Sequence, residues 1–165
     1  MKPRSTPAAA AEPKFDSPEQ EVFLQLWRTY DCLKAFEDEL LGRHELSAQQ
    51  YNALRLLQAS QPGGLQTMEL GRRLISRSPD ITRMLDRLET RGLISRERLT
   101  GNRRVVEVVI TNAGTKLLKG LARDVLQMHR RQVGHLGVSQ QRQLIKLLKA
   151  VRAPHEAVAR AEADA

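Results

Sequence analysis

The sequence is poor in cysteine and has no long apolar run. One cysteine, Cys32, stands among the 165 residues, so an intrachain disulfide and a cysteine-rich zinc cluster are both excluded. No apolar stretch approaches the roughly 18 residues of a membrane span, and residues 1–11 contain no hydrophobic core like that of a signal peptide. We therefore expect a cytoplasmic protein without membrane association.

The chain also lacks the local motifs of common enzymes and metal sites. It has no glycine-rich loop to bind phosphate, no serine in a nucleophile elbow and no carboxylate pair with an identifiable partner. Four histidines are scattered without the spacing of metal ligands, namely His44, His129, His135 and His155. We predict that the protein is not an enzyme and that it needs neither a metal nor a cofactor.

Positive charge is in excess, and most of it lies in one segment. The net charge is +8 and the sequence pI is about 10.2, which favours an acidic polymer as partner. Between Arg72 and Arg104 there are ten arginines, no lysine and four acids, a net charge of +6. Arginine forms planar, forked hydrogen bonds that suit phosphate and guanine edges better than lysine does. A solvated charged face is the alternative, but the bias to arginine favours double-stranded DNA.

The same segment has the pattern of a short helix followed by a β-hairpin. Residues 78–80, Ser-Pro-Asp, are typical of a helix start, and Gly92 is typical of a helix end. Apolar residues at helical spacing predict one buried stripe, made of Ile81, Met84, Leu85 and Leu88. The β-prone runs 93–99 and 105–110 flank a five-residue turn, 100–104. A helix followed by such a wing predicts a winged helix-turn-helix.

Several stretches within residues 46–118 resemble the MarR family of winged-helix transcription regulators. They are LSAQQYNALRLL, MELGRRL, SPDITRMLDRLETRGLISRER, NRRVVEVVIT and the Ala-Gly pair at 113–114, in the family's order and spacing. The resemblance implies a mainly α fold with a small β-wing, a homodimer on double-stranded DNA at a pseudo-palindromic operator, and a role as a repressor. The chain departs from the family at Asn102, where the family usually has an aspartate that steadies the wing arginine.

The charge pattern and the resemblance together predict the residues that contact DNA. They are Arg72, Arg73, Ser76, Arg77, Ser78, Asp80, Thr82, Arg83, Arg87, Arg96, Asn102, Arg103 and Arg104. Base edges are assigned to Ser78, Asp80, Thr82 and Arg83, and phosphates to Arg72, Arg73, Arg87 and Arg96. Asp80 suits either a cytosine amino group or the cap of the helix. In the wing, Arg103 is expected to brace and Arg104 to enter the minor groove.

Long helices are predicted on both sides of the winged helix. Residues 1–16 form a disordered tail, 17–45 a dimerisation helix, 46–111 the DNA-binding domain, and 112–165 further dimerisation helices. Ser-x-x-Gln at 17–20 and 47–50 predicts capping boxes, Thr67 is expected to cap the next helix, and Pro154 to kink or interrupt the last one. The terminal helices have surplus apolar faces, which imply a second subunit. A monomer with long appended helices is the alternative.

The resemblance also implies a response to small molecules, metals or oxidants. Candidate residues for a small aromatic or phenolic effector are Trp27, Tyr30, Tyr51 and Met84, although residues of these types at helical spacing are usually core. Cys32 lies beside Lys34 and close to Arg28, which favour a reactive thiolate. Its place more than halfway along its helix is unlike that of the family's oxidant sensors, which favours an inert thiol.

The same fold allows an alternative function. Winged helices also bind RNA, non-specific DNA or protein partners. A two-fold symmetric footprint, and a salt dependence steeper with duplex DNA than with RNA, distinguish a sequence-specific DNA regulator from these alternatives.

Overall fold

The computed structural model describes residues 14–75, 80–99 and 102–163. Within these ranges the side chains of residues 98, 99, 102–105 and 157–163 are not described, and the predicted tail, 1–16, lies outside the described residues except for its last three. The chain divides into two compact units, Met1–Ala35 and Phe36–Ala165, which are described separately. Among the described residues, no helix is long and apolar enough to cross a membrane.

The first unit consists of the opening turns of helix α1, Pro18–Gly42. The backbone N–H of Gln20 donates to Ser17 Oγ at 3.2 Å, which is one of the two bonds of the predicted capping box. Gln20 Oε1 accepts from the N–H of Asp16 at 2.7 Å, so the side chain of Gln20 reaches the residue before the predicted one. Large apolar side chains are exposed along this helix, including Phe23 at 61% and Trp27 at 62%. The centroids of their rings lie 6.0 Å apart. This part of the chain therefore has an apolar surface that the single chain leaves open to solvent.

The second unit is built on three helices around one core. They are α2 (Ala48–Ala59), α3 (Thr67–Arg73) and α4 (Ile81–Thr90). Helix α2 begins with the predicted capping box, in which Ser47 and Gln50 exchange hydrogen bonds of 3.2 and 2.9 Å. The fully buried side chains of this core include Leu54, Leu57, Leu70, Leu85 and Leu88. Each helix contributes at least one fully buried leucine, so burial of apolar area holds the three together.

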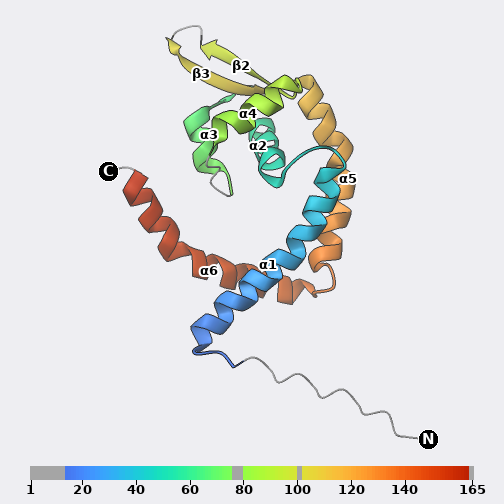
Figure 1. Cartoon of the computed structure of the whole chain (residues 1–165), viewed down its shortest axis with the longest axis vertical. Helices are drawn as coiled ribbons and strands as arrows, with labels where there is room; N and C mark the ends of the chain where they lie inside the picture. The colour runs from blue at the N-terminus through green and yellow to red at the C-terminus, as the bar shows by residue number, and fades with distance from the viewer. Residues whose placement is uncertain (1–13, 76–79, 100–101, 164–165) are drawn as a thin grey trace, which may run out of the picture. The chain divides into compact units, whose positions relative to one another are not determined.

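A three-stranded antiparallel sheet extends beyond these helices, as Figure 1 shows. Its strands are β1 (Leu65–Gln66), β2 (Ile94–Leu99) and β3 (Asn102–Ile110), in the order β1-β3-β2. The predicted turn 100–104 was wrong, because β3 already begins at Asn102, which pairs with Leu99. Main-chain pairing needs no apolar side chain, so β3 begins before the valine-rich run 105–110.

The short strand β1 also corrects the predicted cap at Thr67. Gln66 is the N-cap residue of α3, and its side chain makes no capping hydrogen bond. Leu65 and Gln66 are extended because they pair with Val108 and Glu107 of β3. The sheet therefore determines where α3 begins.

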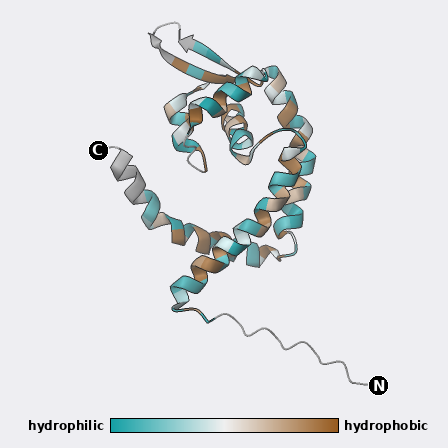
Figure 2. Ribbon diagram, viewed as in Figure 1, coloured by the Kyte–Doolittle hydropathy of each residue, from teal (hydrophilic) through white to brown (hydrophobic). Residues whose placement is uncertain are grey.

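Two long helices follow the wing, α5 (Asn112–Val133) and α6 (Val138–Ala163). Of the two effects predicted for Pro154, the interruption does not occur, because α6 runs through it, and the kink stays a prediction. Proline leaves the carbonyl of Ala150 without a helical donor, and Ala150 is an exposed residue. In Figure 2 apolar residues recur along α6, and several are exposed, namely Val138, Leu144, Ile145, Leu147 and Val151.

Thr111 and Gly114 join the base of the wing to α5. The Thr111 hydroxyl donates to the carbonyl of Gly92 at 2.8 Å and accepts from the N–H of Gly114 at 3.1 Å. A Cβ on Gly114 would lie 2.3 Å from the carbonyl oxygen of Leu93. Glycine is therefore required at this position by close packing, since backbone atoms cannot move aside as a flexible side chain can.

We predict that Gly114→Ala lowers the free energy of unfolding by about 2 kcal/mol or more, because the added methyl group overlaps backbone atoms. The matched control is Gly120→Ala in the same helix, where nothing lies within 4 Å of the added Cβ. That change should raise stability by about 0.5–1 kcal/mol through helix propensity. Urea unfolding of both variants measures the difference, and equal effects would contradict the packing argument.

Candidate nucleic-acid interface

Helix α4 has an apolar face in the core and a polar face in solvent. Met84, Leu85 and Leu88 are buried. Thr82, Arg83 and Arg87 are exposed. The helical period of 3.6 residues separates the two sets, because buried positions recur at intervals of three and four. The core therefore forces the arginines of α4 outward.

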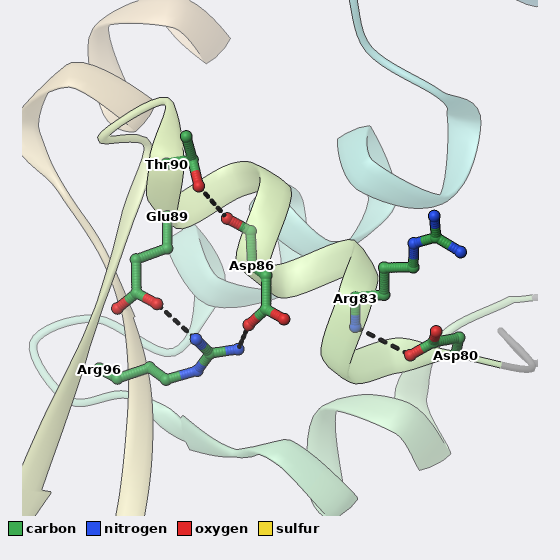
Figure 3. Close-up of polar contacts among 6 residues, drawn as sticks. All are labelled: Asp80, Arg83, Asp86, Glu89, Thr90 and Arg96. Carbon is green, nitrogen blue, oxygen red and sulfur yellow. Dashed lines mark hydrogen bonds and ion pairs between the residues drawn. The ribbon is translucent and has the colours of Figure 1, made fainter.

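Asp80 fixes the start of this helix. Its Oδ1 accepts a hydrogen bond from the backbone N–H of Arg83 at 2.9 Å, as Figure 3 shows. Of the two roles that the sequence left open for Asp80, the structure therefore shows the cap. The Arg83 side chain extends away from Asp80 in the same view. No ion pair neutralises Arg83 or Arg87 within the described part of the chain, so both guanidinium groups are available to a ligand.

Arg96 on β2 is held by two carboxylates of α4 (Figure 3). Its Nη2 lies 2.6 Å from Asp86 Oδ1, and its Nη1 contacts Glu89 Oε2. Burial lowers the pKa of this guanidinium, but the hydrogen bonds and negative charges of Asp86 and Glu89 outweigh it and the net pKa is raised. The sequence predicted a phosphate contact for Arg96. In the structure this side chain ties β2 to α4, and the phosphate contact stays a prediction.

The arginines of α3 differ from each other. Arg72 and Arg73 are both exposed. Arg73 Nε lies 2.6 Å from Glu69 Oε1, one turn earlier in the helix. Exposed pairs of this kind contribute little stability and exchange readily for a phosphate. Arg72 makes no such pair among the described residues.

Part of the predicted interface is outside the described residues. Ser76, Arg77 and Ser78 fall in the segment 76–79, which the structure does not describe. The backbone of Asn102, Arg103 and Arg104 opens strand β3. Their side chains belong to the part that is not described, so the predicted roles of the wing arginines stay predictions.

The four predicted effector residues occupy different environments. Trp27 and Tyr30 are exposed in the first unit, at 62% and 60%. In the second unit Tyr51 packs half-buried against the core, and Met84 is a core member with 8% exposure. Core packing accounts for Met84. A shared pocket for the four residues stays a prediction.

A shallow hollow of about 570 Å³ lies beside the polar face of α4. Its lining residues are Glu45, Gln50, Arg83, Asp86, Arg87, Thr90 and Arg91. None of the four predicted effector residues is among them. Arg91 is not among the residues predicted from the sequence. Its side chain donates to the carbonyls of His44 and Glu45, which lie more than forty positions earlier, so no local pattern identifies this contact. No group of three potential metal ligands occurs in the described ranges 14–75, 80–99 and 102–163.

Comparison with known proteins decides the family. A sequence profile of the MarR family matches residues 46–106. The chain is 52% identical to a MarR transcription factor of known structure from Planctomyces limnophilus, with a TM-score of 0.64, over 83% of this chain and 99% of that one. The chain belongs to the MarR family. It is thus a DNA-binding transcription regulator with the predicted winged-helix fold.

Two further structures share the MarR-family fold. A MarR family regulator from Streptomyces coelicolor, solved in complex with DNA, is 24% identical over 86% of this chain and 91% of that chain, with a TM-score of 0.73. BpsR from Bordetella bronchiseptica, whose DNA binding is regulated by 6-hydroxynicotinic acid, is 20% identical over 85% of this chain and 97% of that chain, with a TM-score of 0.72. No curated protein gives a significant match to this chain.

We predict that Arg96→Gln lowers the free energy of unfolding by about 1 kcal/mol, because it removes charge-assisted bonds to two partly exposed carboxylates. The same substitution in an Asp86→Asn/Glu89→Gln background should cost less than half as much. Urea unfolding of the four proteins completes this mutant cycle. An equal cost in both backgrounds would show that the pairs do not stabilise the wing.

Proposed function

We propose that this MarR-family protein is a repressor that binds a pseudo-palindromic operator as a homodimer and is released by a small aromatic or phenolic effector. One recognition helix, α4, enters the major groove of each half-site, and the half-sites are centred roughly 10 base pairs apart. Repression follows from occupation of the promoter.

The observation that carries this proposal is the exposed arginine face of α4. Arg83 and Arg87 stand one turn apart on the solvent face, and neither has an ion-pair partner among the described residues. By contrast, Arg96 and Arg73 are paired with carboxylates. Guanidinium groups without intramolecular partners can form bidentate bonds to guanine edges or phosphates at no cost in broken ion pairs. This helix is therefore the part of the second unit best suited to read DNA.

The exposed apolar side chains of the terminal helices support the homodimer. The first unit exposes Phe23 and Trp27, and α6 exposes Leu144, Leu147 and Val151. Large apolar side chains exposed on a helix are typical of interfaces. A second copy offers the same surfaces in return, as a two-fold interface requires.

The wing and the effector complete the proposal. Arg104 enters the minor groove beside each half-site, and Arg103 supports it. The regulation of a structural neighbour's DNA binding by 6-hydroxynicotinic acid supports an aromatic acid as effector. Titration of aromatic carboxylates into the protein–DNA complex tests this part. No release at millimolar concentrations would contradict it.

We predict that Arg83→Ala weakens binding to the DNA flanking the protein's own gene by roughly tenfold or more, because a bidentate base contact contributes about 1–3 kcal/mol. Binding to a scrambled duplex of equal length should fall much less. Arg123→Ala is the matched control, since Arg123 is an exposed arginine of α5. Fluorescence anisotropy at two salt concentrations measures both duplexes. An equal loss for the two variants would mean that Arg83 supplies charge alone.

We predict that Leu147→Asp converts the dimer largely to a monomer at micromolar concentration, because a carboxylate replaces an apolar contact of the interface. Leu147 is 56% exposed in the single chain, so the substitution does not disturb a buried core. Lys149→Asp, on the opposite face of α6, is the control and should stay dimeric. Sedimentation velocity distinguishes monomer from dimer. If the Leu147→Asp protein stays dimeric, Leu147 does not lie in the dimer interface.

A further inference from the structure

Helix α1 ends in a backbone cap that does not use the carbonyls of His44 and Glu45. The N–H of Leu46 donates to the carbonyl of Leu41 at 3.0 Å, and the N–H of Glu45 donates to that of Gly42 at 3.0 Å. Glu45 is left-handed, with φ of 53°. These are the bonds of a Schellman motif. The motif satisfies the carbonyls of Leu41 and Gly42, whereas no backbone N–H of the described residues donates to those of His44 and Glu45.

Arg91, the C-cap residue of α4, donates to both of these carbonyls. Its Nη1 donates to the carbonyl oxygen of Glu45 at 2.6 Å, and its Nη2 donates to that of His44 at 2.9 Å. The three residues all belong to the second unit, although 46 positions separate Arg91 from Glu45. One side chain of the recognition helix thus completes the C-terminal cap of the first long helix.

Arginine is the residue suited to this contact. Its planar fork places two N–H groups at neighbouring carbonyls at the same time, which the single ammonium of lysine cannot do in that geometry. The carbonyls at the end of a helix also carry partial negative charge, which favours a cation. Glu45, held in a conformation that non-glycine residues rarely adopt, is fixed there partly by this contact.

The end of α4 has the same kind of cap as the end of α1. The N–H of Gly92, left-handed with φ of 66°, donates to the carbonyl of Glu89 at 2.7 Å, and that of Leu93 donates to the carbonyl of Leu88 at 3.0 Å. The backbone of Arg91 is therefore fixed between a helix and a tight turn. Two capped helix ends are thus joined through one side chain.

We propose that Arg91 is a positioning residue that sets the orientation of α4 relative to the end of α1. This inference rests on the proposed function, because that orientation matters if two recognition helices must match one operator. Leu40 and Leu41, at the end of α1, are buried in the same core as α4. Apolar burial is non-directional, whereas the forked hydrogen bonds fix the angle. A shift of the dimerisation helix therefore reaches the recognition helix through Arg91.

The test compares Arg91→Ala and Arg91→Lys with Arg55→Ala, which removes the same charge from an exposed position of α2. Both Arg91 variants should lose roughly three- to thirtyfold in affinity for the operator fragment. Their affinity for a scrambled duplex should fall no more than that of Arg55→Ala. If Arg91 instead contacts phosphate, Arg91→Lys will retain operator binding, or both duplexes will be lost together. Either result overturns the proposal.

Hydrogen exchange tests the same contact without DNA. The amides of Glu45 and Leu46 should exchange roughly tenfold faster in both Arg91 variants than in Arg55→Ala, because their cap opens more often. Unchanged exchange would overturn the proposal. If the unaltered protein shows no preference for the operator fragment, the proposed function fails, and the exchange result still decides whether Arg91 holds the end of α1.

Discussion

Burial of one face of α4 is the constraint on which the rest of the structure depends. Met84, Leu85 and Leu88 lie in the core between the other helices and the sheet. Once these positions are buried, the helical period directs Arg83 and Arg87 to solvent. The exposed arginine face of α4 is therefore a consequence of core packing, because burial of the apolar face alone directs these side chains to solvent.

The wing is attached to this helix by charge and by close packing. Arg96 connects β2 to Asp86 and Glu89 of α4. Thr111 and Gly114 attach the base of the hairpin to α5 without space for a further atom. These contacts hold the hairpin to the helix. A winged helix reads the major and minor grooves together, so the angle between its two parts contributes to specificity.

Local patterns in the sequence predicted much of this architecture. The capping box at Ser47, the cap of α4 at Asp80 and the helix end at Gly92 are short-range signals, and the structure confirms all three. The other two residues of the predicted helix start, Ser78 and Pro79, lie outside the described residues. The two-residue strand β1 has no periodicity to detect, because its pairing partner lies some forty residues away. The partners of Arg96 and Arg91 were missed for the same reason. Pairing between distant segments depends on the fold, which composition and spacing do not specify.

The most direct test of a dimeric operator-binding protein is a hydroxyl-radical footprint on the DNA flanking the protein's own gene. A homodimer with one α4 in each half-site should protect two half-sites related by two-fold symmetry, with centres roughly 10 base pairs apart. Further protection is expected in the flanking minor grooves. A single unsymmetrical footprint, or uniform weak protection that disappears as salt rises, would contradict operator binding by a dimer, because the arginine face of α4 would then bind DNA without reading a sequence.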